Sequence, residues 1–254
     1  MRAIAGPLDD RLIFVMGCPR SGTTFLAGAI GSCPGLVDLG EVAPLKAAVP
    51  HLTASEPAVA APQLRRILAT TRRLGLVGHL RAVEQTPETV FVTAGLLEAF
   101  PEARLVHIVR DARDVVCSLL ERGWLSAGRG GADDAGAAYG SAARFWVEAD
   151  RREEFEAATD TRRAAWAWRR YVTAGLAAPE RSTEIRYEQL ADGPSEVAGA
   201  LATALELPVA PLAAVLSQAH AQSVGRYREQ LTVDQQDEVE EESGELLAAL
   251  GYLQ

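Results

Sequence analysis

The sequence has 254 residues, a length that one domain fills with an open sheet covered by helices on both faces. Apolar residues make up 48% of the chain and charged residues 23%, as in ordinary globular proteins. The net charge of −9 argues against a general nucleic-acid-binding protein, which is normally basic overall. A local basic pocket for a small anion remains compatible with this charge, because the chain holds 25 basic residues.

Lysine and cysteine are scarce enough to limit the chemistry. Lys46 is the only lysine, so the other basic residues are arginines. The three cysteines show no CxxC or Cys/His ligand spacing, which predicts small buried side chains in a reducing compartment. The residues before 12 are mixed, and the apolar run after them is too short for a signal peptide or a membrane span. We therefore expect a cytoplasmic protein.

The first predicted unit is a strand, a loop and a helix. The continuous apolar run LIFVM (12–16) is typical of a strand buried on both faces of a parallel sheet. The loop GCPRSGTT (17–24) follows, and a helix is predicted over 23–30. A short strand is then predicted over 36–39, ahead of Glu41.

The middle of the chain continues to alternate between helices and strands. The predicted elements are a helix at 62–76, a strand at 80–83, a helix at 89–100, a strand at 105–109 and a helix at 112–122. Asp111 is placed to cap the last of these helices. The Gly, Ala and Asp-rich segment 123–140 predicts a flexible loop or lid.

The remainder is mostly helical, with one further strand. A helical pattern resumes near 142 and includes the aromatic stretch AAWAWRRYV; a strand is predicted at 184–186, and helices at 194–205, 211–219 and 232–250. We expect the aromatic helix over 164–172 and the loop at 123–140 to select the substrate. The acidic face of the last helix is interpreted as solvated charge.

This alternation predicts an α/β fold. We expect a single domain over 1–254, with a central, mainly parallel sheet flanked by helices, of the P-loop nucleotide-binding type. Ligands of such sheets sit at the carboxyl ends of the strands. Three polar clusters follow predicted strands, at 17–24, 84–87 and 110–118.

The loop GCPRSGTT has the outline of a phosphate-binding loop without its lysine. A glycine-rich turn between a strand and a helix directs backbone N–H groups at one anion, and the helix dipole reinforces them. Nucleotide triphosphatases place a lysine after the second glycine, where this chain has Thr23. Arg20 lies inside the loop and offers a planar guanidinium suited to phosphate or sulfate. The spacing alone also fits a structural turn with no ligand.

The segment RLVHIVRDARDVVCSLL contains a second candidate anion site. Arg110 lies where the strand ends, and Ser118 lies about two helical turns into the next helix. A guanidinium and a hydroxyl at this spacing can share an anion at one strand–helix junction. Alternatively, Arg110 pairs with Asp111 or Asp114 and Ser118 faces solvent.

CPRSGTTFL together with FPEARLVHIVRDARDVVCSL resembles the sulfotransferases that use 3′-phosphoadenosine 5′-phosphosulfate (PAPS). The similarity is strongest to the group that contains tyrosylprotein, glycosaminoglycan and many bacterial small-molecule sulfotransferases, and it extends from about Leu12 to Tyr252. It implies sulfuryl transfer from PAPS to a hydroxyl or amine of a small-molecule, lipid or glycan acceptor, leaving adenosine 3′,5′-bisphosphate. It implies no metal ion.

The resemblance also implies roles for individual residues. The first loop would hold the 5′-phosphosulfate through Arg20, Ser21, Gly22, Thr23 and Thr24, and the 3′-phosphate would be held by Arg110 and Ser118. IRYEQL resembles a third segment of the family and makes Tyr187 a neighbour of the adenine. SVGRYREQLT resembles a basic loop that closes over the nucleotide through Arg226 and Arg228.

Catalysis in this family implies a cation on the leaving oxygen and a base for the acceptor. We assign Arg20 to the leaving oxygen. Glu84 and Glu41 are both candidates for the base, and Glu84 is preferred because Thr86-Pro87 follows it as in glycosaminoglycan sulfotransferases. Where those relatives carry a lysine, this chain has Gln85.

Two further residues bear on this assignment. Lys46 is the only lysine able to replace the missing one, although an exposed loop position is the simpler expectation for it. The phenol and steroid sulfotransferases use a histidine as base, and no histidine here matches it. His107 is predicted to be structural, within a buried strand.

Two other functions remain open. One is a P-loop kinase or nucleotide hydrolase, disfavoured by Thr23 and by the lack of a convincing acidic Mg²⁺ site. The other is a nucleotide-binding protein without catalysis, for which Gln85 is the only indication.

Overall fold

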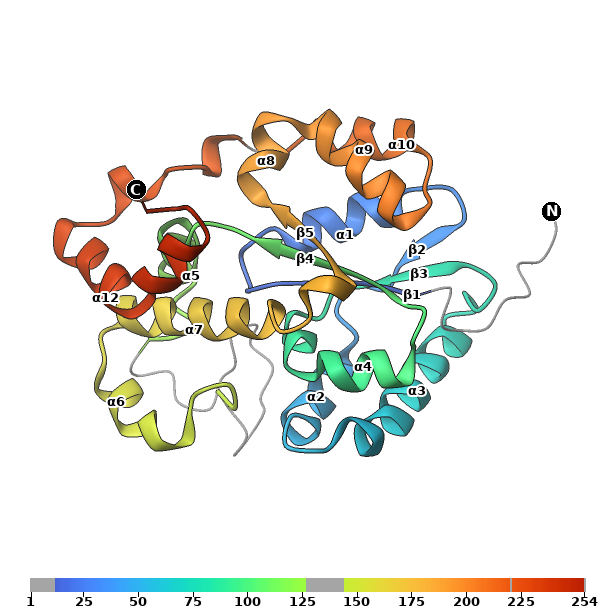
Figure 1. Cartoon of the computed structure of the whole chain (residues 1–254), viewed down its shortest axis with the longest axis horizontal. Coiled ribbons are helices and arrows are strands. Elements are labelled where there is room, and N and C mark those ends of the chain that lie inside the picture. Colours follow the sequence, from blue (N-terminus) through green and yellow to red (C-terminus); the bar gives the residue numbers. More distant parts are fainter. Residues whose placement is uncertain (1–11, 127–143, 220, 254) are drawn as a thin grey trace.

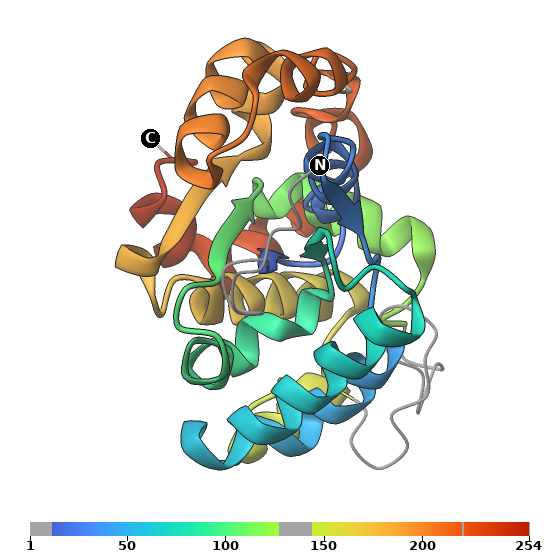
Figure 2. The ribbon, with the colours of Figure 1, turned by 90° about the vertical axis from the view of Figure 1, so that its right-hand side faces the viewer.

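The computed structural model describes residues 12–126, 144–219 and 221–253, and these form a five-stranded sheet with helices on both faces (Figures 1 and 2). The strands are β1 (Leu12–Met16), β2 (Leu36–Asp38), β3 (Arg81–Glu84), β4 (Arg104–Val109) and β5 (Ser182–Arg186). Their order is β2-β3-β1-β4-β5, and all four pairings are parallel. The predicted α/β fold with a parallel sheet is confirmed.

Twelve α-helices connect and cover the strands within the described residues. They are α1 (Thr23–Gly31), α2 (Ala43–Leu52), α3 (Pro57–Leu74), α4 (Thr93–Ala99), α5 (Ala112–Arg122), α6 (Arg152–Ala157), α7 (Asp160–Gly175), α8 (Tyr187–Asp192), α9 (Pro194–Leu205), α10 (Val209–Leu216), α11 (Tyr227–Gln230) and α12 (Val233–Ala249). Short 3₁₀ helices lie at Pro87–Val92, Ala149–Arg151, Pro179–Arg181 and Ala221–Ser223. None of these helices is long and apolar enough to cross a membrane.

The alternating side chains of β1 divide the core into two layers. Leu12, Phe14 and Met16 pack with α2, α3, α4, α5, α7 and α12, whereas Ile13 and Val15 pack with α1, α9 and α10. All five are almost completely buried, as expected of a central strand covered on both faces. The strand predicted from this apolar run therefore lies between two layers of helices, with α1, α9 and α10 on one face of the sheet and α3, α4 and α7 on the other (Figure 1).

The strand order creates one crevice at the carboxyl edge of the sheet. The connection after β1 leads toward β2 and β3, and the connection after β4 leads toward β5 on the other side. Neighbouring connections that diverge in this way leave a crevice where ligands of parallel sheets bind. The loop 17–22 and Arg110 flank this crevice, since β1 and β4 are paired neighbours.

Several predicted elements agree closely with the structure. The strand over 12–16 and the helices over 112–122 and 194–205 have the predicted bounds. Helix α3 begins at Pro57, and Pro62 lies inside it. The helix expected over 89–100 is split, because Pro87–Val92 is a 3₁₀ turn and α4 begins only at Thr93.

Three short helices were not predicted from the sequence. They are α2, α8 and α11. The first of them carries Lys46, which is 5% exposed, so the expectation of an exposed loop lysine is wrong. The expected flexible loop at 123–140 lies mostly outside the described residues.

A close contact between α7 and β4 gives a test of this packing. An added Cβ at Gly175 would lie 2.2 Å from Nε2 of the buried His107 ring, so Gly175→Ala should lower the free energy of unfolding by about 1–3 kcal/mol. Gly199 in α9 has no atom within 4 Å of an added Cβ, so Gly199→Ala should raise it by about 0.5–1 kcal/mol. Urea unfolding measures both changes. Equal changes in the free energy of unfolding for the two variants would contradict this packing.

Candidate functional site

The loop between β1 and α1 has the geometry of an anion-binding turn. Arg20 has φ 73° and Gly22 has φ 99°, so the chain turns through two left-handed residues before α1 begins. An added Cβ at Gly17 would lie 2.5 Å from the carbonyl oxygen of Ile108, which explains why glycine is required there. Gly22 caps α1 without a side-chain hydrogen bond. The first amides of the helix are thus free to meet an anion.

Tyr187 lies directly against this loop. An added Cβ at Gly22 would lie 2.7 Å from the Tyr187 ring, so this glycine allows the loop and the ring to touch. Tyr187 begins α8 immediately after β5 and is 7% exposed. The guanidinium carbon of Arg110 lies 4.4 Å from the ring centroid, in a cation–π contact. Residues from three strand–helix junctions therefore meet at one place.

Arg110 and Ser118 are both linked to Arg20. Arg110 Nη1 donates to the carbonyl oxygen of Arg20 at 3.2 Å, and Arg20 Nε donates to Ser118 Oγ at 2.9 Å. Arg110 Nη2 also donates to the carbonyl oxygen of Ser223, while its buried Nε has no hydrogen-bond partner. The salt bridge considered as an alternative is present in weak form, with Nη2 3.9 Å from Asp114 Oδ2. Ser118 is 5% exposed and does not face solvent.

These residues line one pocket of about 410 Å³. Its lining is Arg20, Gly22, Thr23, Thr24, Phe25, Arg110, Ser118, Tyr187, Ser223 and Arg226. Phe25 and Ser223 are the members that sequence reasoning missed. Phe25 follows the loop directly and was within reach of prediction, whereas Ser223 contributes a backbone carbonyl, which leaves no signal in the side-chain pattern.

Two of the residues expected to bind the nucleotide do not line the pocket. Ser21 lies within the loop and is completely buried, and its Oγ has no hydrogen-bond partner. Arg228 is exposed, and its guanidinium carbon lies 4.9 Å from the Tyr227 ring. Arg226 does line the pocket, where it contacts Glu121 and donates to Gln230 Oε1 at 2.6 Å.

The segment that carries Arg226 is fixed to α5. Asp114 accepts hydrogen bonds from the backbone of Gly225 at 2.8 Å and Tyr227 at 3.1 Å. The side chain of Asp114 is 1% exposed, and this burial raises its pKa. Asp114 thus serves to hold the segment over the pocket, a role that the sequence did not indicate.

Positive charge accumulates in this pocket. The pKa of Arg20 is lowered by burial and then by the guanidinium groups of Arg122, Arg110 and Arg226, while Glu121 acts in the opposite direction. The guanidinium carbon of Arg20 also lies 5.6 Å from the centre of the Trp124 ring. Mutual repulsion among cations is relieved when an anion binds between them. Charge, shape and free amides all favour an anionic ligand.

The candidate bases lie in a separate polar cluster after β3. Glu84 is completely buried; its Oε1 accepts from the Thr86 backbone N–H at 2.8 Å and from the Thr86 hydroxyl. Its Oε2 has no hydrogen-bond partner, and burial raises its pKa to about 7. Glu41 is exposed and accepts from Lys46 Nζ at 2.8 Å. Lys46 Nζ also lies 3.3 Å from Glu88.

This polar cluster does not share the lining of the anion pocket. Neither Glu84 nor Glu41 is among the residues that line it. The buried side chain of Gln85 stands next to Glu84, and its Oε1 also has no hydrogen-bond partner. The structure therefore brings together most of the residues expected to bind the nucleotide and leaves both candidate bases in a separate cluster after β3.

The helix expected to select the acceptor turns its aromatic side chains into the core. Trp166, Trp168 and Tyr171 are completely buried. Trp168 Nε1 donates to the carbonyl oxygen of Arg110 at 2.8 Å, so this residue supports the site from behind. His107 is buried within β4, and burial lowers its pKa to about 4, in agreement with a structural role.

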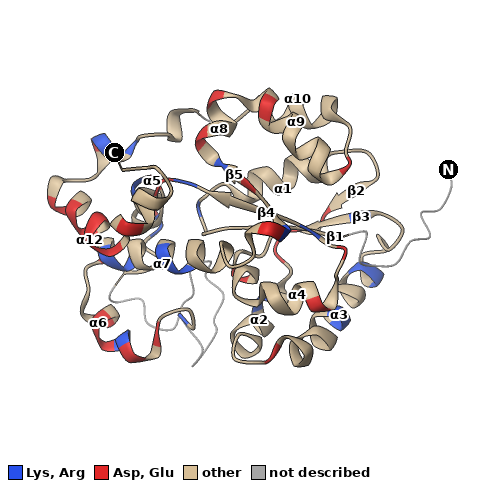
Figure 3. Ribbon diagram, in the orientation of Figure 1, with Lys and Arg blue, Asp and Glu red and all other residues tan. Residues whose placement is uncertain are grey.

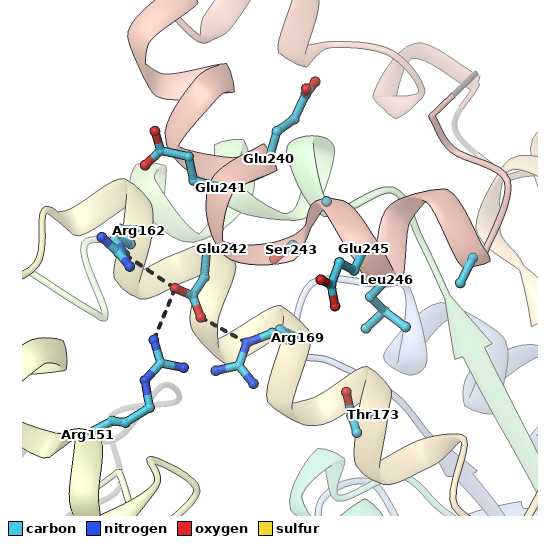
Figure 4. Close-up of a pocket in the computed structure, with 12 residues that line it drawn as sticks. Arg151, Arg162, Arg169, Thr173, Glu240, Glu241, Glu242, Ser243, Glu245 and Leu246 are labelled. Carbon is cyan, nitrogen blue, oxygen red and sulfur yellow. Dashed lines mark hydrogen bonds and ion pairs between the residues drawn. The ribbon is translucent and has the colours of Figure 1, made fainter.

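A larger pocket of about 560 Å³ lies between α7 and α12, and its three arginines surround Glu242 (Figure 4). Acidic residues are frequent along α12 and basic residues lie on α7 (Figure 3). The Glu242 carboxylate is 3% exposed and has three arginine neighbours: Arg169 Nε at 2.8 Å, Arg162 Nε at 3.3 Å and Arg151 Nη2 at 3.9 Å. The other acidic side chains of α12 are at least partly exposed to solvent, as predicted, whereas Glu242 is buried. This cluster joins α7 to α12, and the pocket lining holds four glutamates and three arginines, so the pocket does not favour an anion.

No group of three or more potential metal ligands occurs within the described ranges 12–126, 144–219 and 221–253. The cysteines Cys18, Cys33 and Cys117 are buried and form no disulfide, as their spacing predicted.

Comparisons with known proteins identify the family of this chain. The sequence model of the sulfotransferase family matches residues 43–211, a range that contains Arg110, Ser118 and Tyr187. No curated protein matches the sequence. The fold resembles that of the sulfotransferase domain from the curacin biosynthetic pathway, with a TM-score of 0.54 and 16% identity over 92% of this chain and 96% of that chain.

Two further solved structures share the fold. The sulfotransferase domain of the Synechococcus PCC 7002 olefin synthase has a TM-score of 0.54 and 14% identity, covering 91% of this chain and 93% of that chain. Mouse SULT7A1 complexed with PAP has a TM-score of 0.54 and 13% identity, covering 97% and 90%. Identities this low establish the fold alone, whereas the family match covers well over half of the sequence. The chain belongs to the sulfotransferase family.

Proposed function

We propose that this protein transfers a sulfuryl group from PAPS to a hydroxyl or amine of a small-molecule, lipid or glycan acceptor. The observation that carries the proposal is the lining of the pocket of about 410 Å³: it includes three arginines and two threonines and no acidic residue. A ligand with anionic groups at both ends fits such a lining, since Arg20 and Arg110 reach it from different strand–helix junctions.

At one end, the loop and α1 would hold the 5′-phosphosulfate. Thr23 and Thr24 add hydroxyl donors to the free amides of the first helical turn, and Arg20 adds a positive charge. The Ser21 hydroxyl is a further donor or acceptor without a hydrogen-bond partner within the loop. When bound, PAPS supplies the activated sulfuryl group. The helix dipole and Arg20 would then stabilise negative charge on the leaving phosphate oxygen.

At the other end, Arg110 and Ser118 would hold the 3′-phosphate. The buried Nε of Arg110 lacks a hydrogen-bond partner, which is unfavourable unless a ligand supplies one. Ser118 Oγ is already bonded to Arg20 Nε, so nucleotide binding would exchange this contact for contacts with phosphate. Tyr187 and Arg226 would contact the nucleoside and close over it, whereas the exposed position of Arg228 supports only a weaker, outer contribution.

Glu84 is our preferred base for the acceptor. A general base works best when its pKa lies near the working pH, and the pKa of Glu84 is about 7. Its Oε2 has no hydrogen-bond partner, while Thr86 holds Oε1. Glu41 is the alternative because it is accessible, although its carboxylate is engaged by Lys46.

Ligand-dependent stability separates this function from its alternatives. We expect adenosine 3′,5′-bisphosphate to raise the Tm without Mg²⁺, because ligand at about 100 times its Kd adds ~2.7 kcal/mol of stability. ATP should raise it less, and Mg²⁺ should add nothing. Stabilisation by ATP only with Mg²⁺ would instead indicate a kinase or hydrolase. Stabilisation by the bisphosphate, with no transfer from PAPS to a broad panel of acceptors, would indicate a binding protein.

The two candidate bases can be distinguished by their charge-neutral variants. Glu84→Gln should lower kcat by about 10²–10⁴, as for removal of a general base, and Glu41→Gln should have a much smaller effect. In the unmodified protein the carboxylate must be ionised to accept a proton, so the rate should fall as the pH decreases below about 7. Equal, mild losses in both variants would rule out both residues as the base.

A further inference from the structure

Glu188 connects the two strand–helix junctions that supply Arg110 and Tyr187 to the pocket of about 410 Å³. Its Oε1 accepts a hydrogen bond from the Asp111 backbone N–H at 3.0 Å, and its Oε2 accepts from the Tyr252 hydroxyl at 2.9 Å. Asp111 follows Arg110 at the start of α5, and Glu188 follows Tyr187 at the start of α8. One carboxylate thus holds together the junctions from which Arg110 and Tyr187 extend.

Tyr252 is itself held firmly in place. Its carbonyl oxygen accepts from Arg113 Nη2 at 3.0 Å, and Arg113 also pairs with Asp111 at 2.7 Å. The guanidinium carbon of Arg186 lies 5.2 Å from the Tyr252 ring. The segment after α12 is therefore fixed to α5 and to β5, and it presents a fixed hydroxyl to Glu188.

The charge of Glu188 opposes the function of the neighbouring pocket. A carboxylate near an anion site reduces anion affinity by simple electrostatics, so its presence is unfavourable unless its geometry compensates. Burial raises the pKa of Glu188, because the ionised carboxylate loses solvation there. Its two hydrogen bonds account for both carboxylate oxygens.

We propose that Glu188, held by Tyr252, is a positioning residue that sets the spacing of Arg110 and Tyr187 and thereby the affinity for the nucleotide. The stacking of these two side chains at 4.4 Å, and the contact of Tyr187 with Gly22, both depend on where α8 begins relative to α5. This inference rests on the proposed function, in which Arg110 holds the 3′-phosphate.

The test measures Kd by calorimetry for adenosine 3′,5′-bisphosphate and adenosine 5′-phosphate. Glu188→Ala should raise the Kd of the bisphosphate about tenfold and that of the 5′-phosphate only about twofold, since Arg110 serves the 3′-phosphate. Tyr252→Phe removes one hydrogen bond and should raise the first Kd about threefold. Glu188→Gln keeps an acceptor oxygen and should bind the bisphosphate within about twofold of the unmodified protein.

Glu196→Ala is the matched control, because Glu196 is an exposed carboxylate on the neighbouring helix α9. It removes the same charge and should leave both Kd values nearly unchanged. If Glu188→Ala binds the bisphosphate equally or more tightly, with or without a lower Tm, the positioning role is overturned. If the unmodified protein does not bind the bisphosphate at all, the proposed function fails and this inference fails with it. Tyr252→Phe provides the same comparison if Glu188→Ala does not fold.

Discussion

Concentrated positive charge at the crevice between β1 and β4 is the constraint on which the rest of the site depends. Arg20, Arg110 and Arg226 line one pocket whose lining contains no acidic residue, and their proximity contributes to the lowered pKa of Arg20. Arg20 is itself a left-handed residue of the loop. Arg110 follows β4, and Trp168 donates a hydrogen bond to its carbonyl oxygen. Arg226 lies in a segment whose backbone donates to Asp114. The mutual repulsion of these guanidinium groups is unfavourable without a ligand, and an anionic ligand relieves it.

The missing lysine of the phosphate loop is explained by this arrangement. In a triphosphatase, the lysine after the second glycine serves the β- and γ-phosphates. Here Thr23 occupies that position at the start of α1, and Arg20 supplies the charge from inside the loop. Arg20 Nε donates a hydrogen bond to Ser118 Oγ, and both residues line the same pocket. Two anion motifs that are distant in sequence are adjacent in space.

The sequence was sufficient to predict the parallel sheet, and most of the residues expected to bind the nucleotide line one pocket. Apolar runs such as 12–16 locate strands, and the polar residues after strands must meet at one edge of a parallel sheet. Side-chain patterns cannot reveal hydrogen bonds to backbone groups, such as the carbonyl oxygen of Ser223. They also did not predict the short helix α2, in which Lys46 is buried. The burial of Trp166 was also not predictable, because an aromatic helix face looks the same whether it contacts a ligand or the core.

The most direct test of the central claim is the rate of sulfuryl transfer by Arg20→Ala, compared with Arg20→Lys and with Arg66→Ala as an exposed control on α3. We expect Arg20→Ala to remain folded but to lose about 10²–10³ in kcat, as when one group that stabilises transition-state charge is removed. Arg20→Lys should retain part of the rate, and Arg66→Ala should retain all of it. A turnover by Arg20→Ala equal to that of the unmodified protein would contradict the claim.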